Sequence, residues 1–277
     1  MANGISIHIG LNSVDPAQYA GWDGKLAACE FDAKDMQALA DKQGYKTTLL
    51  LTKDATSARV IEAISAAARD LKSGDQLLLT YSGHGGQLPD KNGDEPDDLD
   101  ETWVLYDRQI VDDELYALWS KFKKGVSVLM LSDSCHSGTV AKNLAIGKAI
   151  QANRPRTAAN EPRFRIMPVK KQKAVYEKHK ELYDGIQTAN LPGDKAKVNA
   201  CVVLISGCQD NQLSGDGARN GVFTAALLKA WNDGKFKGTL RLFVRAIGAQ
   251  MPPWQSPNYF RVGAINVMFE MNGPFAL

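Results

Sequence analysis

The sequence predicts an α/β protein built on a mostly parallel sheet, and three observations carry this prediction. Aliphatic and β-branched runs alternate with helical stretches through the first 135 residues. The runs "QLLLTYSG" (76–83) and "VSVLMLSD" (126–133) are almost continuously apolar, which is typical of strands buried on both faces. With 277 residues, 44% of them hydrophobic and 23% charged, the chain has enough apolar material for a sizeable core, which excludes fibrous and mainly disordered classes.

The first elements follow from periodicity and from the residues that end them. We expect a strand at 5–10 and a helix over 27–44 that stops at Gly44, because glycine adopts the left-handed C-cap most easily. A second strand follows at 45–51. The stretch 56–74 places its apolar side chains at helical spacing after a hydroxyl cap, and so predicts a second helix.

The middle of the chain changes character twice. Seven of the twelve residues at 90–101 are acidic, which indicates a loop before a short strand at 102–107 and a helix over 111–122. The segment 141–197 holds 13 Lys/Arg against 5 Asp/Glu and is broken by prolines, so we expect a mobile insertion or linker.

The same segment 141–197 has three interpretations: a solvated loop, a nucleic-acid patch, or a linker that the protein cleaves itself. Aromatic residues are few in it, and we expect no nucleic-acid partner. Six of its basic residues are candidate cleavage sites: Arg154, Arg156, Arg163, Arg165, Lys170 and Lys171.

The last part of the chain returns to regular structure. We expect a strand at 200–207, helices over 220–234 and 239–250, and a final strand at 263–271. Trp254 and Tyr259 in "MPPWQSPNYF" either wall a cleft or cover the sheet. The alternation predicts one domain over 1–277, in which 141–197 separates the parts 1–140 and 198–277.

The cysteine spacing and the length of the apolar runs exclude several functional classes. The four cysteines show no CxxC spacing, so a zinc site or a disulfide scaffold is not expected. The chain has no apolar run of about 18 residues, and its beginning lacks the features of a signal peptide, so we expect a cytoplasmic protein without a membrane partner.

Two of the apolar runs end on residues that suit thiol catalysis. His84 follows the run at 76–83 in "SGHGG", and Cys135 follows the run at 126–133 in "DSCHSG". Ligands bind at the carboxyl ends of strands in open α/β sheets, so we expect both side chains to face one crevice, with His84 activating the thiol. The amides of Gly85 and Cys135 are candidate oxyanion donors.

These motifs together resemble the caspase-type cysteine peptidases, and specifically the metacaspases and bacterial caspase-like proteins. "CEFDA" at 29–33, "IVDDEL" at 110–115 and "ISGCQDNQLSGDG" at 205–217 add to "YSGHGG" and "DSCHSG". The similarity spans nearly the whole chain outside 141–197. It implies a caspase-like three-layer α/β/α sandwich with a roughly six-stranded sheet, in which 1–140 resembles the large subunit and 198–277 the small one.

The resemblance also implies cleavage after Arg or Lys. Asp32 and Asp133 match acidic positions of the family's specificity pocket, with Ser82 close by. Paired carboxylates suit a guanidinium and repel an acidic side chain. A pocket for aspartate would need basic residues, and no arginine stands beside these motifs.

Calcium is the cofactor that the resemblance raises. In the family, activating calcium is bound through positions that correspond to Asp100, Asp112 and Asp113, and to a fourth at which this chain has Lys142. A lysine ammonium among three carboxylates can replace a cation, so we expect that no cofactor is required.

The sequence thus predicts a cysteine endopeptidase that cleaves protein or peptide substrates after Arg or Lys, acting as a monomer, as the resemblance implies. Two alternatives remain: an inactive caspase-like scaffold with a blocked cleft, and a thiol hydrolase acting on non-protein amides.

Overall fold

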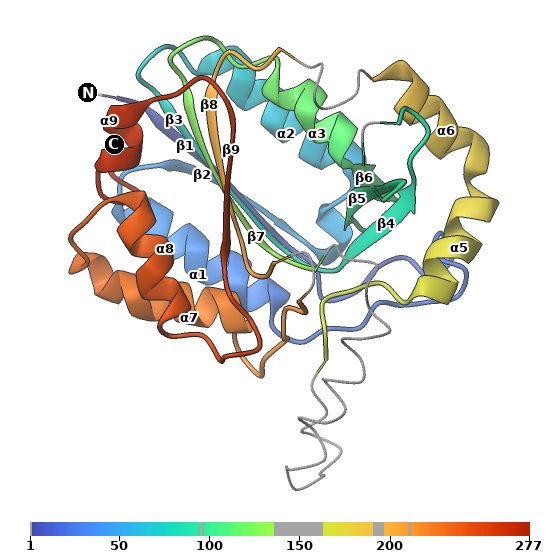
Figure 1. Cartoon of the computed structure of the whole chain (residues 1–277). Helices are drawn as coiled ribbons and strands as arrows, with labels where there is room; N and C mark the ends of the chain where they lie inside the picture. The colour runs from blue at the N-terminus through green and yellow to red at the C-terminus, as the bar shows by residue number, and fades with distance from the viewer. Residues whose placement is uncertain (1, 94, 96, 136–162, 191–196, 210–211) are drawn as a thin grey trace, which may run out of the picture.

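A computed structural model describes residues 2–93, 95, 97–135, 163–190, 197–209 and 212–277. Within these ranges, no helix is both long enough and apolar enough to cross a membrane. Figure 1 shows a central sheet with helices on both of its faces.

The central sheet has six strands in the order β2-β1-β3-β7-β8-β9. The first five run parallel to one another, and β9 pairs antiparallel with β8 at the edge. Their bounds are β1 Gly4–Gly10, β2 Lys46–Leu51, β3 Gln76–Ser82, β7 Ser127–Asp133, β8 Cys201–Ser206 and β9 Asn258–Gly263. The predicted mostly parallel, six-stranded sheet is therefore confirmed.

Helices cover both faces of this sheet (Figure 1). Helices α2 and α3 lie on one face, and α1, α7 and α8 lie on the other. Their bounds are α1 Cys29–Lys42, α2 Ser57–Asp70, α3 Asp112–Trp119, α7 Val222–Trp231 and α8 Leu240–Gly248. Gly44, at φ +87°, follows the end of α1, as the sequence predicts.

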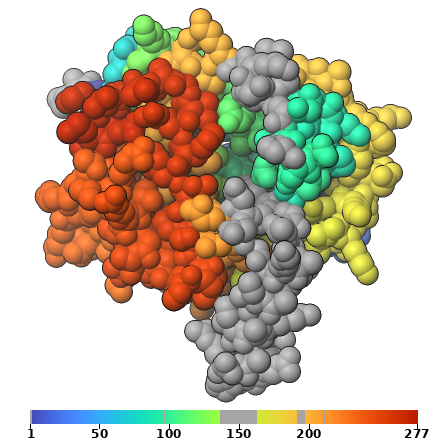
Figure 2. All heavy atoms as spheres, viewed as in Figure 1, coloured from blue at the N-terminus to red at the C-terminus, as the bar shows by residue number. Residues whose placement is uncertain are grey.

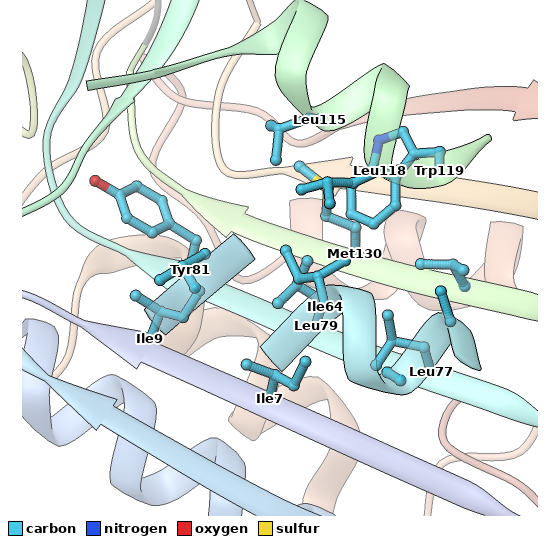
Figure 3. Close-up of a cluster of buried hydrophobic side chains, with 14 of the residues drawn as sticks. Ile7, Ile9, Ile64, Leu77, Leu79, Tyr81, Leu115, Leu118, Trp119 and Met130 are labelled. Atoms are coloured by element: carbon cyan, nitrogen blue, oxygen red, sulfur yellow. The ribbon is translucent and has the colours of Figure 1, made fainter. Parts of the chain in front are cut away.

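The face under α2 and α3 holds the larger of the apolar clusters (Figure 3). Ile7 and Ile9 of β1 and Leu77 and Leu79 of β3 project into it toward Ile64 of α2. Burial of each such side chain stabilises the fold by about 1.5–3 kcal/mol. This core fixes the strand register, and with it the positions of the residues that follow the strand ends.

A second, three-stranded antiparallel sheet was not predicted. It consists of β4 Gly85–Pro89, β5 Leu99–Val104 and β6 Gln109–Val111, in the order β4-β5-β6. The glycines after His84 begin this sheet, since Gly85 and Gly86 of β4 pair with Trp103 and Thr102 of β5.

The expectation of a mobile linker is wrong for 163–190. This part contains helices α5 Val169–Lys178 and α6 Lys180–Ala189, which pack against β4 and the loop 14–22. Their charged side chains face outward while Val175 and Tyr183 are buried, so the high charge concealed an apolar face. Residues 141–162 and 191–196, with Arg154, Arg156 and Lys142, lie outside the described residues.

The expected last strand at 263–271 is also wrong. The chain forms β9 at Asn258–Gly263, and residues of the expected strand form the short helix α9 Val267–Met271. The Asn266 side chain accepts a hydrogen bond from the Phe269 amide at 3.1 Å and so caps this helix. Phe269 of the helix is buried, and Glu270 pairs with Arg261 of β9 at 2.6 Å, which attaches the helix to the sheet edge.

Candidate active site

His84 and Cys135 come from neighbouring strands. Ser82 at the end of β3 pairs with Asp133 at the end of β7, and His84 and Cys135 each follow two residues later. Both side chains are buried, at 6% and 0% exposed. Because β3 and β7 are parallel, their carboxyl ends bring the two residues to the same edge of the sheet.

The His84 ring is oriented by the loop that precedes α1. Its Nε2 lies 3.0 Å from the carbonyl oxygen of Gly24, and the Trp22 ring lies 4.8 Å from it, centroid to centroid. A carbonyl can only accept, so Nε2 carries the hydrogen and Nδ1 keeps a lone pair. Nδ1 is buried and has no hydrogen-bond partner among the described residues. Burial lowers the pKa of His84 from 6.5 to about 4, so the imidazole is a neutral base.

The Cys135 thiol contacts the backbone of Ser214. The Ser214 amide donates to Sγ at 2.5 Å, and the Ser214 carbonyl oxygen lies 3.6 Å from Sγ. Ser214 was not among the candidate residues, because no local pattern shows which backbone amide will face the sulfur.

Arg165 occupies the space between these groups. The amides of Gly85 and Cys135 both donate to its carbonyl oxygen, at 3.0 and 3.1 Å. These are the two amides that the sequence analysis proposed as oxyanion donors. Both amides therefore hold the same backbone carbonyl oxygen in this structure.

The Arg165 guanidinium lies in a pocket of three carboxylates and is fully buried. Its Nη2 forms ion pairs with Asp32 at 2.7 Å and with Asp216 at 3.0 Å. Its Nη1 lies 3.0 Å from the Asp133 carboxylate and donates to the Ser82 hydroxyl at 2.8 Å. These carboxylates hold the pKa of Arg165 well above its ordinary value against the effect of burial. Asp32, Ser82 and Asp133 are the residues that the resemblance indicated.

Each carboxylate is itself held in place. Asp32 accepts from the amide of Gly221 at 3.0 Å, and Asp133 accepts from the Thr224 hydroxyl at 2.8 Å. Asp216 accepts from the amides of Ala27 and Ala28, just before α1. Burial raises the pKa of Asp32 to about 6, while the Arg165 charge opposes the rise. The three carboxylates are therefore fixed in position by hydrogen-bond partners of their own.

Two further residues of this pocket were missed. Asp216 stands in "SGDG", ten residues after the end of β8, and no local pattern distinguishes it from other loop aspartates. Gly221 lies against the guanidinium: a Cβ there would come within 2.5 Å of Arg165 Cζ. Nothing local to Gly221 indicates this, since the constraint comes from a residue 56 positions away.

The chain around Arg165 runs through the site in extended form. The Arg165 amide donates to the Ser214 carbonyl at 3.0 Å, and the Asp216 amide donates to the Arg163 carbonyl at 2.7 Å. On the other side, the Met167 amide donates to the Gly85 carbonyl at 2.8 Å. Short strand pairing on both sides of one residue is the way extended peptides bind along sheet edges.

Aromatic side chains border the site where Arg163–Arg165 enters it. The Phe164 ring meets Trp254 edge to face, with ring centroids 6.4 Å apart. Trp254 therefore walls the site, whereas Tyr259 lies on β9 and donates to Glu270 at 2.7 Å. In Figure 2 the C-terminal elements, in orange and red, lie on the left. The elements β4 to β6, in green, and α5, in yellow, lie on the right.

A separate acidic cluster lies at the start of α3. Ligand atoms of Glu95, Glu101 and Asp112 all lie within 4.8 Å of one another, whereas Asp113 accepts from Asn92 at 2.6 Å. Burial and then the neighbouring carboxylates, Glu101 first, raise the pKa of Asp112 well above its ordinary value. Carboxylate oxygens suit a hard cation such as calcium, and these residues would hold one. Of the three expected ligands, Asp100, Asp112 and Asp113, only Asp112 belongs to this cluster.

Comparisons with known proteins identify the family of this chain. The caspase domain family matches residues 14–261. Metacaspase-1 of Mycosarcoma maydis is 33% identical over 245 residues, covering 75% of this chain and 58% of the relative. Metacaspase-1 of Kluyveromyces lactis is 30% identical, covering 76% of this chain and 54% of the relative. The chain thus spans little more than half the length of these relatives.

Solved structures of other proteins have the same fold as this chain. A crystal structure of a protein from Geobacter sulfurreducens is 50% identical, with a TM-score of 0.88 over 99% of this chain and 98% of that one. Caspase-1 from Spodoptera frugiperda is 11% identical, with a TM-score of 0.54 over 95% of this chain and 86% of that one, and supports the fold alone. On the match across residues 14–261, this chain belongs to the caspase-domain family of peptidases.

Proposed function

We propose that the protein is a cysteine endopeptidase that cleaves protein and peptide substrates after Arg or Lys. The observation that carries this proposal is the placement of Arg165, whose carbonyl is held by two amides while its guanidinium contacts three carboxylates. A substrate arginine bound in the same way would present its carbonyl carbon to Cys135.

The reaction follows from the groups around that carbonyl. Nδ1 of His84 takes the Sγ proton of Cys135, and the thiolate attacks the carbonyl carbon. The amides of Gly85 and Cys135 hold the oxyanion, and each such donor is worth about 10²–10³-fold in rate. The intermediate collapses to a thioester as the leaving amine takes a proton from His84. Water, deprotonated by His84, then attacks the thioester and restores the thiol.

Specificity follows from the acidic pocket. Asp32, Asp133 and Asp216 stabilise a positive side chain, and they would repel an aspartate or glutamate. The planar guanidinium contacts different carboxylates with its two terminal nitrogens, whereas a lysine ammonium is a single point charge. We therefore propose that arginine is preferred over lysine.

Two further properties complete the proposal. No cofactor takes part in these steps, so activity in a chelator is expected. The described residues already hold every group that the reaction uses, so one copy of the chain is sufficient for catalysis.

The test is hydrolysis of matched fluorogenic peptides ending in Arg, Lys or Asp, with calcium and with chelator. We expect release after Arg and Lys in both conditions, and its loss in Cys135→Ala. Cys208→Ala is the matched control, since Cys208 is buried in the same small cluster as Cys135 and has no role in the mechanism. Release after Asp would contradict the pocket assignment, and the absence of release from any peptide would favour the scaffold alternative.

A further inference from the structure

The residue before Arg165 has a seat of its own at the edge of the site. The backbone of Phe164 pairs with Gly215 as a single antiparallel bridge. Successive side chains of an extended chain point to opposite sides, so the Phe164 ring lies away from the acidic pocket. The half-buried ring packs against the small apolar cluster that contains Cys135 and Leu213. This seat therefore takes an apolar side chain, in contrast to the charged pocket beside it.

The Trp254 indole forms one wall of this seat. The rings of Phe164 and Trp254 are perpendicular, at 90°, with their centroids 6.4 Å apart. Aromatic rings prefer this edge-to-face arrangement, because the positive edge of one ring meets the negative face of the other. An aromatic side chain therefore gains an interaction here that an aliphatic side chain of the same size lacks.

The loop that carries Trp254 is held by the next residue, Gln255, whose side chain is buried. The Gln255 side chain accepts from the Gly215 amide at 3.2 Å and donates to the Gly207 carbonyl at 2.7 Å. The Gln255 amide donates to the Pro252 carbonyl at 3.0 Å and closes a turn around Trp254. The indole is thus tied to the segment of chain that runs beside the substrate backbone.

Gly215 leaves the space that the indole occupies. A Cβ at this position would lie 3.2 Å from Cη2 of Trp254 and 3.0 Å from Cγ2 of Val222. Both distances are shorter than ordinary contacts between carbon atoms, so a side chain here would displace its neighbours. The indole therefore lies directly beside the backbone with which Phe164 pairs.

We propose that Trp254 selects the substrate residue that precedes the cleaved arginine, and that it favours an aromatic side chain at that position. This inference rests on the proposed function and adds a second determinant of specificity to it. Phe164 and Arg165 show that one extended peptide makes both contacts at once, with its ring against Trp254 and its guanidinium among the carboxylates. The preferred substrates are therefore peptides in which an aromatic residue stands directly before arginine.

The test uses fluorogenic tripeptides that end in arginine and differ only at the preceding residue, which is phenylalanine, cyclohexylalanine, leucine or arginine. Phenylalanine and cyclohexylalanine have nearly the same size and apolar surface, but only phenylalanine has an aromatic ring. We expect kcat/KM to be about three- to tenfold higher for the phenylalanine peptide. Residues 163–165 compete with every peptide alike, so they do not change this ratio.

The arginine peptide tests a different chemistry for the same wall. An indole face also binds cations, so a substrate with two successive arginines would be preferred if Trp254 acted in that way. We expect the phenylalanine peptide to be cleaved with the higher kcat/KM, because the rings in the structure meet edge to face and the seat beside them is apolar.

Trp254→Leu removes the indole and keeps an apolar side chain in its place. We expect the advantage of phenylalanine over cyclohexylalanine to disappear in this variant. The discrimination between Arg and Lys at the cleaved position should stay, because it depends on the carboxylates on the other side of the peptide. Phe260→Leu is the matched control and should keep the wild-type ratio, since Phe260 is an exposed aromatic residue of β9 that pairs with Leu204.

Gly215→Ala is the second variant, and it replaces Trp254→Leu if that protein does not fold. The new Cβ would lie 3.2 Å from the indole, so Trp254 has to shift and the advantage of phenylalanine should shrink. The comparison of peptides in the wild type needs neither variant.

The outcomes separate this inference from the proposed function. Equal kcat/KM for the phenylalanine and cyclohexylalanine peptides, a higher value for the arginine peptide, or an unchanged ratio in folded Trp254→Leu would each overturn the inference. All three leave cleavage after arginine standing. The absence of release from every peptide would contradict both.

Discussion

Replacing Asp216 by asparagine is expected to reduce the preference for arginine. Asp216 is buried and bonds Nη2 of Arg165 at 3.0 Å, while Asp133 contacts Nη1. A hydrogen bond to a charged group contributes about 1.5–3 kcal/mol. Since about 1.4 kcal/mol corresponds to a factor of ten, kcat/KM for an Arg peptide should fall about ten- to a hundredfold.

The lysine peptide serves as the internal comparison for Asp216→Asn. A lysine ammonium cannot contact all three carboxylates as the two guanidinium nitrogens do, so its kcat/KM should fall less and the Arg/Lys ratio should drop. Asp54→Asn is the control, because Asp54 pairs with Arg59 at the surface, where an ion pair contributes about 0–1 kcal/mol. Equal losses for the two peptides, or no loss, would refute the assignment of Asp216 to the pocket.

Three other perturbations give equally direct outcomes. Gly221→Ala should raise KM for Arg peptides, because the new Cβ would lie 2.5 Å from the guanidinium carbon; an unchanged KM would contradict this contact. As pH falls, KM should rise near pH 6, because Asp32, with its pKa of about 6, loses its charge there. The value of kcat should persist until His84 is protonated near its pKa of about 4. A single pH transition shared by kcat and KM would contradict this separation. Asp112→Asn should raise the midpoint of thermal unfolding at pH 7 in chelator. The pKa of Asp112 is raised in the folded state, so this carboxyl reduces the stability of the fold as pH rises from its unfolded pKa to its folded pKa. A lower midpoint would refute this.

The strand ends show which features of the site can be predicted from local sequence. The apolar runs before His84 and Cys135 can be buried only as central strands, and parallel pairing then brings their carboxyl ends together. The positions of His84, Cys135 and Gly85 follow from that topology. Asp32, Ser82 and Asp133 were indicated by the resemblance to the family, and Asp32 lies in α1 and not at a strand end.

The occupant of the pocket was not recognisable in this way. Arg165 stands among basic residues and prolines that predict a solvated linker, and no short-range signal distinguishes it from Arg163 two positions earlier. Its burial depends on carboxylates 133, 32 and 51 positions away at Asp32, Asp133 and Asp216, which balance the cost of removing its charge from water. Gly221 and Ser214 owe their roles to other long-range contacts, with the Arg165 guanidinium and with the Cys135 sulfur.

The sequence by itself therefore determined that a mostly parallel sheet forms and that His84 and Cys135 follow two of its strands, because the apolar pattern of a run is a local property that parallel pairing converts into proximity. The tertiary structure alone decided which arginine fills the acidic pocket, which backbone groups hold its carbonyl, and which helices support the loop around His84. Those outcomes depend on complementary charge and shape between distant segments, and such complementarity exists only once the chain has folded.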